Sequence, residues 1–288
     1  MMRILFALFT VICIHSTVWA QPVSVFIIDT FNNTINSPSD AVNDSTINGT
    51  AAWLGFGPLT GVLGSNRVMG NYLTEVDPGS SPPYLNNATR VGSGVFSIDN
   101  PFDTRSGGQI IWQGNTTTPG TNPITSHPAS FGLGNLDFNT ILTDPNFYFQ
   151  WSVINADNRD WTYTVRAYTN NASNYFEGSV TSNQSGVLLD IARINFLVGA
   201  GAPNWADIDA ISFSASYSGG LLGGDLAINF LQLAVPEMST YMMIGLMLLL
   251  GGAVYTYRKS SKEQKKTEIA SETVASNDAT PVVPTLTV

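Results

Sequence analysis

Three segments of the chain alternate between apolar and polar residues with a period of two, which is the pattern of a half-buried β-strand. They span residues 147–154, 161–168 and 211–218. The apolar positions are rich in the aromatic and β-branched residues that strands favour. The alternation predicts that one set of side chains in each segment points into a hydrophobic core: Phe147, Phe149, Trp151 and Val153; Trp161, Tyr163, Val165 and Ala167; Ile211, Phe213, Ala215 and Tyr217.

Dense turn signals separate these segments from other short apolar runs. Clusters of Gly, Pro, Asn, Asp and Ser lie at 32–40, 77–84, 99–103, 114–123 and 218–225. Before Pro236 no segment has a convincing helical stripe; residues 186–197 come nearest, and Gly186 and Asn195 weaken that pattern. We therefore predict an all-β fold, a single β-sandwich of jelly-roll type over residues 21–234.

The first twenty residues have the features of a secretory signal peptide. Arg3 precedes an apolar stretch, and Val18 and Ala20 occupy the small-residue positions of a cleavage site. We predict cleavage after Ala20, which also removes Cys13, the only cysteine of the sequence. The exported chain then relies on apolar burial without disulfides, which favours a bacterial envelope protein over an exported animal protein.

A second apolar segment lies near the C-terminus. Residues 241–257 carry no charge, and as a helix they would span about 25 Å, near the lower limit for crossing a bilayer. Basic residues follow directly: Arg258, Lys259, Lys262, Lys265 and Lys266. This arrangement predicts a transmembrane helix with the β domain outside, followed by a stop-transfer cluster and disordered cytoplasmic tail over 258–288. The alternative is a buried helix of the soluble domain.

The junction between the domain and the apolar segment resembles the PEP-CTERM sorting signal of bacterial exported proteins. That signal combines a Val-Pro-Glu-Pro-Ser-Thr-like motif, one membrane helix and a terminal basic cluster. Here residues 235–240 supply the motif, with Val235, Pro236, Glu237, Ser239 and Thr240 as matches and Met238 in place of the second proline.

The resemblance implies processing by an exosortase and association with an exopolysaccharide matrix. Pro236 denies a backbone donor and keeps the preceding residue extended, so the motif would stay accessible as a linker. The chain continues beyond the point where members of that family usually stop, so a permanent single-pass anchor stays open as the alternative.

Charge is segregated along the chain. Every lysine follows residue 257. Between residues 21 and 234 the sequence has six arginines and sixteen carboxylates. A domain with this excess of negative charge is expected to repel nucleic acid and anionic membrane surfaces. Most of its carboxylates are expected on a solvated surface.

The residues that commonly perform catalysis are scarce. The predicted exported chain has one histidine, His127, with no nucleophile elbow near it, and lacks the ligand set of a zinc site. We expect no enzyme, no catalytic residue and no cofactor. Calcium is the cation that the composition allows, with candidate ligands Asp207, Asp209, Asp225 and Asn229; the alternative is that these are turn residues flanking the last strands.

Aromatic residues offer a binding chemistry instead. Most tryptophans of a sandwich are expected in the core, and Trp205, in the loop 201–209, is the best candidate for an exposed ring that stacks on sugar. The sequence thus predicts an exported surface or matrix protein, structural or adhesive, whose partners are the membrane, an exosortase-type enzyme and exopolysaccharide. The alternatives are a carbohydrate-binding module of the matrix and a permanently anchored membrane protein.

Overall fold

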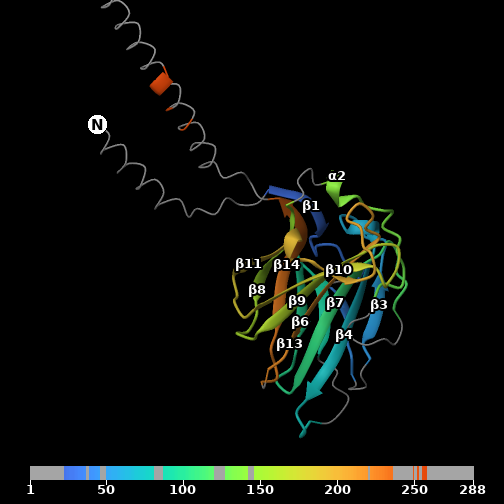
Figure 1. The fold of residues 1–288 in the computed structure, drawn as a ribbon. Helices are drawn as coiled ribbons and strands as arrows, with labels where there is room; N and C mark the ends of the chain where they lie inside the picture. The colour runs from blue at the N-terminus through green and yellow to red at the C-terminus, as the bar shows by residue number, and fades with distance from the viewer. Residues whose placement is uncertain are drawn as a thin grey trace, which may run out of the picture. The chain divides into compact units, whose positions relative to one another are not determined.

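The computed structural model describes residues 23–36, 39–45, 50–80, 87–119, 127–141, 146–219, 221–235, 249, 252 and 255–257. One compact unit spans Pro22–Pro236 and contains all of the described strands (Figure 1). The residues outside this unit form a second unit, of which the structure describes only the last few positions given above.

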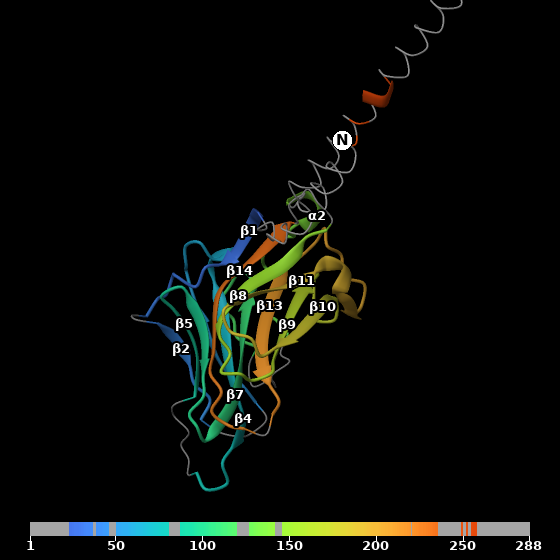
Figure 2. The same ribbon diagram turned by 90° about the vertical axis from the view of Figure 1, so that its left-hand side faces the viewer.

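The described strands form two antiparallel sheets of seven strands each, which confirms the predicted all-β sandwich (Figure 2). The first sheet has the order β11-β8-β14-β6-β5-β2, and β1 pairs with the second half of β14. Its strands are β1 (Val23–Asp29), β2 (Asp40–Val42), β5 (Ala88–Gly92), β6 (Val95–Asp99), β8 (Tyr148–Asn155), β11 (Val187–Ala192) and β14 (Leu226–Val235).

The second sheet has the order β12-β10-β9-β13-β7-β4-β3. Its strands are β3 (Ala52–Phe56), β4 (Arg67–Val76), β7 (Thr104–Trp112), β9 (Trp161–Tyr168), β10 (Tyr175–Ser182), β12 (Leu197–Ala200) and β13 (Ala210–Tyr217). The helices among the described residues of this unit are one turn each: η1 (Leu63–Ser65), α2 (Phe138–Ile141) and η2 (Arg193–Asn195).

The core lies between the two sheets, and the alternating segments fill it as predicted. All twelve side chains that the sequence pattern placed inside belong to one buried cluster, with Tyr217 the most exposed of them at 6%. The period of two explains this result, because successive side chains of a strand point to opposite faces. Burial of these large aromatic and aliphatic side chains is the main source of stability in a domain without disulfides.

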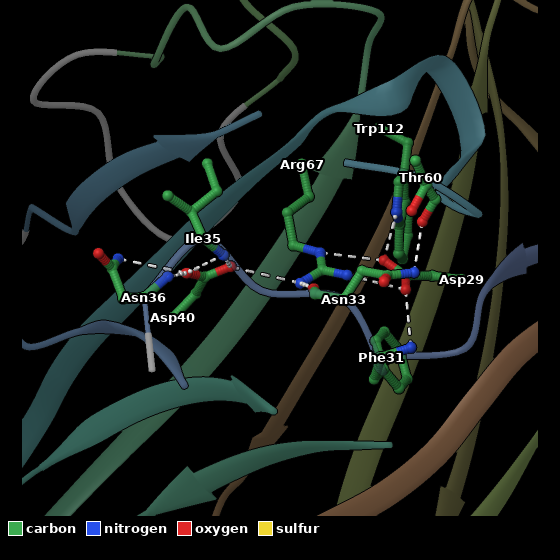
Figure 3. Close-up of polar contacts among 9 residues, drawn as sticks. All are labelled: Asp29, Phe31, Asn33, Ile35, Asn36, Asp40, Thr60, Arg67 and Trp112. Carbon is green, nitrogen blue, oxygen red and sulfur yellow. Dashed lines mark hydrogen bonds and ion pairs between the residues drawn. The ribbon is translucent and has the colours of Figure 1, made fainter. Parts of the chain in front are cut away.

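A buried ion pair ties the two sheets together. Asp29 ends β1 of the first sheet, and its carboxylate accepts hydrogen bonds from Arg67 Nη2 (2.9 Å) and Nε (3.1 Å) at the start of β4 in the second sheet. The indole Nε1 of Trp112, at the end of β7, donates to the same carboxylate at 3.0 Å. The backbone N–H of Phe31 donates to it at 2.8 Å (Figure 3). Asp29 is therefore fully satisfied although it is inaccessible to solvent.

A second carboxylate completes this cluster. Asp40 Oδ2 lies 3.6 Å from Arg67 Nη1, and both side chains are fully buried. Asp40 Oδ1 accepts the backbone N–H groups of Ile35 and Asn36, each at 3.0 Å, while Arg67 Nη1 donates to the carbonyl of Asn33 at 2.8 Å (Figure 3). Asp29 and Asp40, like Asp44 and Asp209, are exceptions to the expectation that most carboxylates lie on a solvated surface. The partners of Asp29 and Asp40 satisfy both carboxylates, so we assign this cluster a structural role.

Candidate functional site

The outer face of the second sheet carries a continuous line of residues that crosses six strands. Residues directly opposite each other in antiparallel strands share one face. The pairs Trp53↔Gly70, Gly70↔Gln109, Gln109↔Ser214, Ser214↔Thr164 and Thr164↔Ser179 therefore place these residues on one side. Gly70 and Gln109 are buried, and the other four are at least partly exposed. The next residues along the central strands, Ile110, Phe213 and Val165, are buried in the core. We call the line Trp53, Gly70, Gln109, Ser214, Thr164 and Ser179 the polar row.

Trp53 supplies the aromatic end of the polar row. A Cβ atom on Gly70 would lie only 2.6–2.7 Å from atoms of the six-membered ring of Trp53, so the ring packs directly against the glycine backbone. Trp53 is nevertheless partly exposed, and its indole Nε1 has no hydrogen-bond partner. A buried polar atom without a partner costs free energy. The indole thus offers a fixed, partly exposed apolar surface, while its Nε1 atom is buried.

Hydroxyl groups form the middle and far end of the same face. The Oγ atoms of Thr164 and Ser179 lie 3.0 Å apart, and those of Thr162 and Thr181 on the next line lie 3.0 Å apart. Ser214, on the central strand β13, is partly exposed. Each hydroxyl can donate and accept, and neighbouring strands repeat such groups at about 4.8 Å. The face can therefore hydrogen-bond a ligand that carries many hydroxyl groups.

A charged and aromatic group flanks the polar row. Arg166 Nε donates to Glu177 Oε2 at 2.5 Å, and the guanidinium lies 5.2 Å from the centre of the Tyr175 ring. The ring of His127 lies 5.5 Å from Tyr175 and 5.7 Å from Tyr168. Burial lowers the pKa of His127 and the charge of Arg166 lowers it further, against a smaller opposing effect of Glu177. The lowered pKa favours the neutral form of His127, and its Nδ1 atom has no hydrogen-bond partner.

Trp205 lies in the core, which corrects the expectation of an exposed ring. Its exposed fraction is 7%, and its ring stacks on Phe176 at 4.1 Å with an interplanar angle of 5°. The loop 201–209 turns inward because its backbone is anchored: the Trp205 carbonyl accepts the N–H of Phe138 at 2.9 Å, and Asn204 N–H donates to Thr169 Oγ1 at 3.0 Å. Together with Phe147 and Phe196, Trp205 also lines a pocket of about 430 Å³.

The four candidate calcium ligands do not come together. Asp209 accepts the backbone N–H of Asn170 at 2.8 Å, and Asp207 accepts the side-chain amide of the same residue at 2.8 Å. Asp225 lies in the segment between β13 and β14, directly before β14. Its Oδ1 atom accepts the backbone N–H of Asn100 at 2.7 Å. Asn229 is exposed within β14. Among the residues that the structure describes, no three His, Cys, Asp or Glu side chains form a group suited to a metal ion.

Asp225 has an electrostatic environment of its own. Burial raises its pKa, the backbone N–H of Asn100 opposes this, and the charges of Asp157 and Asp99 raise it. Asp157 Oδ2 also accepts the backbone N–H of Asp225 at 3.0 Å. These contacts are those of a turn that leads into β14, which is the alternative that the sequence left open for Asp225.

Most of the predicted targeting residues lie outside the described residues. These are the signal peptide 1–20, Pro236–Thr240 of the motif, most of the apolar segment 241–257 and the basic residues from Arg258 onward. Val235 is the exception: it is the last residue of β14 and pairs with Val23 of β1. In the described part of the chain, no helix has the length and hydropathy that a membrane crossing requires.

The comparison with known proteins gives no family. No family model and no curated protein matches the chain. One similar solved structure is a family 11 carbohydrate-binding module from Clostridium thermocellum in complex with a β-1,3-1,4-mixed-linked tetrasaccharide. It has 10% identity and a TM-score of 0.30, with 73% of this chain and 94% of that chain covered.

Two further similar structures are TmCBM61 in complex with β-1,4-galactotriose and the C-terminal family 22 carbohydrate-binding module of Clostridium thermocellum Xyn10B. The first has 11% identity and a TM-score of 0.23, covering 68% of this chain and 88% of that chain. The second has 9% identity and a TM-score of 0.22, covering 68% and 92%. These scores are too low to carry an argument about family or ligand, so the sandwich assignment depends on the strand pairing itself.

Proposed function

We propose that the domain binds a neutral polysaccharide on the outer face of its second sheet. The observation that carries this proposal is the polar row, in which the partly exposed ring of Trp53 lies on the same face of six paired strands as the hydroxyl groups of Ser214, Thr164 and Ser179. A sugar ring has apolar C–H faces and a rim of hydroxyl groups. The aromatic ring can stack on the apolar face of a sugar, and the side-chain hydroxyl groups can bond to its rim.

The structure supports binding more strongly than bond cleavage. On this face His127 packs against the rings of Tyr168 and Tyr175, and its Nδ1 atom has no hydrogen-bond partner that could act with it in catalysis. Arg166 and Glu177 neutralise each other, which favours a ligand without net charge. A strand-based platform is also rigid, so its donors and acceptors are positioned before the ligand arrives, which reduces the entropy lost on binding.

Replacing Trp53 with alanine is expected to weaken polysaccharide binding at least tenfold, or about 1.4 kcal/mol, because the stacking surface is lost. The measurement is affinity electrophoresis of the purified protein in gels that contain a mixed-linked β-glucan, a xylan or a galactan. The control is Phe102→Ala, which removes an aromatic side chain that is 87% exposed and lies outside the polar row. Equal retardation of both variants, or no retardation of the unaltered protein in any gel, contradicts the proposal.

We also propose that the chain is exported and held at the cell surface through the segment that follows the domain, by a permanent anchor or by exosortase-type sorting. The sequence 235–266 supports this, as does the end of the compact unit at Pro236, which places Glu237–Thr240 after the folded domain. Because Val23 and Val235 are paired, the domain is connected to both flanking segments at neighbouring strand ends.

Deletion of residues 241–266 is expected to move the protein from the membrane fraction of bacterial cells to the soluble exported fraction. An epitope placed after Val288 separates the two routes: loss of the epitope from the mature form supports sorting, and its retention supports a permanent anchor. A deletion variant that still sediments with the membrane contradicts both.

A further inference from the structure

A second line of hydroxyl groups runs beside the polar row on the outer face of the second sheet. Ser216 of β13 lies opposite Thr162 of β9, and Thr162 lies opposite Thr181 of β10. The polar row crosses the same three strands two residues away along each strand. Together the two lines form what we call the hydroxyl array, in which every residue is at least partly exposed: Ser214, Thr164, Ser179, Ser216, Thr162 and Thr181.

The hydroxyl array is regular because its three strands pair without interruption. β9 pairs with β10 over eight successive residues and with β13 over eight, and neither pairing has a register shift. The pairings of β14 with β8 and of β10 with β12 do have such shifts, and a bulge bends a strand and disrupts its ladder. The hydroxyl groups of the array therefore repeat at about 4.8 Å across the strands and about 6.8 Å along them.

The surface of the hydroxyl array is uncharged and low in relief. Its six side chains are all serine or threonine, so none of them rises far above its neighbours. Arg166 and Glu177 lie opposite each other at the next outward position of β9 and β10, and they form an ion pair at this border. The pocket beside Trp205 is lined by other residues. The array therefore suits a ligand that lies over a broad surface.

The hydroxyl groups of the array are oriented by bonds among themselves. Thr162 Oγ1 lies 3.0 Å from Thr181 Oγ1, and Thr164 Oγ1 lies 3.0 Å from Ser179 Oγ. Each hydroxyl has one donor and two acceptor lone pairs, so a pair that shares one hydrogen bond keeps one donor and three acceptors. A single hydrogen bond contributes little net free energy. Firm retention therefore requires a ligand that bonds to several of these groups at once.

We propose that the hydroxyl array binds an ordered, insoluble polysaccharide whose chains are packed side by side, with one chain over the polar row and its neighbour over the second line. This inference rests on the proposed function and deepens it, because it names the physical form of the polysaccharide that the same face binds. Chains that are fixed in a packed surface lose little conformational freedom on binding, whereas a short soluble chain must first become ordered. A regular array of two lines therefore favours the packed form.

The test measures adsorption of the purified full chain to two insoluble polysaccharides, microcrystalline cellulose and α-chitin. The soluble competitors are the matching hexasaccharides, cellohexaose and chitohexaose. We expect saturable adsorption to at least one solid, and we expect that an excess of its hexasaccharide by mass does not reverse it. Thr181→Gln places a long neutral side chain in the second line and is expected to weaken adsorption about tenfold. Thr181→Ser keeps the hydroxyl group and the low relief, so it should retain adsorption.

Ser97→Gln is the matched control. Ser97 is partly exposed on β6 of the first sheet, and its replacement should leave adsorption unchanged. The inference is overturned if the unaltered protein adsorbs to neither solid, if the hexasaccharide displaces it completely, or if Thr181→Gln and Ser97→Gln lose adsorption equally with unaltered unfolding transitions. Retardation in the polysaccharide gels together with any of these results leaves the proposed function in place. Failure of the proposed function is seen separately, as the absence of retardation in every gel.

Discussion

Replacing Arg67 with methionine is expected to lower the free energy of unfolding by about 3–5 kcal/mol. The side chains of Asp29 and Asp40 are both fully buried on either side of Arg67, and the variant leaves two carboxylates in the core without a counter-charge. Methionine keeps much of the length and apolar volume of the arginine stem, so the loss reflects charge more than packing. The measurement is urea unfolding of both proteins, followed by tryptophan fluorescence.

The pH dependence of this loss identifies its cause. Burial raises the pKa of Asp29, and the charge of Arg67 is the largest effect that opposes this rise. In the Arg67→Met variant the pKa of Asp29 therefore rises further above its unfolded value. The folded state then binds a proton more tightly than the unfolded chain, so the variant loses stability as pH rises and regains it on acidification. We expect the deficit relative to the unaltered protein to be larger at pH 7.5 than at pH 5.

Arg90→Met is the matched control. Arg90 pairs with Asp99 at 2.7 Å, but both side chains are about 40% exposed, and a pair of that kind contributes roughly 0–1 kcal/mol. If the two arginine variants lost the same stability, or if the deficit of Arg67→Met were the same at both pH values, the buried cluster would not be the stabilising feature that its geometry indicates.

The strands that line the core could be predicted because the pattern that marks each of them lies within its own sequence. In 147–153, 161–167 and 211–217 the period of two alone separates buried from outward positions. Burial in Ala52–Phe56 does not alternate so clearly, because Leu54 is 50% exposed although it lies two residues from the buried Phe56, so the pattern does not single out Trp53. The polar row could not be predicted, because it depends on which strands pair and in which register, and sequence-distant strands such as β7 and β13 become neighbours only in the fold.

The buried cluster shows the same limit for charged residues. Asp29, Asp40 and Arg67 are separated by 11 to 38 positions, and no local pattern marks them as partners. Composition favours solvated carboxylates, since isolated charges are costly to bury. Burial becomes acceptable only when one arginine, one indole and several backbone N–H groups converge on the same carboxylates, and that convergence is a property of the assembled sheets.

Trp205→Ala is the second substitution with a large expected effect, and its effect is on stability. The ring stacks on Phe176 at 4.1 Å and meets Phe147 at 5.2 Å and Phe196 at 5.5 Å, so its removal leaves a cavity where the loop 201–209 joins the core. Loss of a buried tryptophan costs about 3–5 kcal/mol, measured by thermal or urea unfolding.

A comparison with Trp53→Ala distinguishes the binding role expected for Trp53 from the structural role expected for Trp205. Trp53 is partly exposed on the outer face, so its loss is expected to cost about 1 kcal/mol of stability while abolishing most polysaccharide binding. Trp205→Ala should show the reverse: a large drop in stability, with neutral polysaccharide binding retained at temperatures where the variant is still folded. If Trp205→Ala left the unfolding transition in place and removed polysaccharide binding, the ring would be a ligand contact, and the assignment of the binding face to the polar row would be wrong.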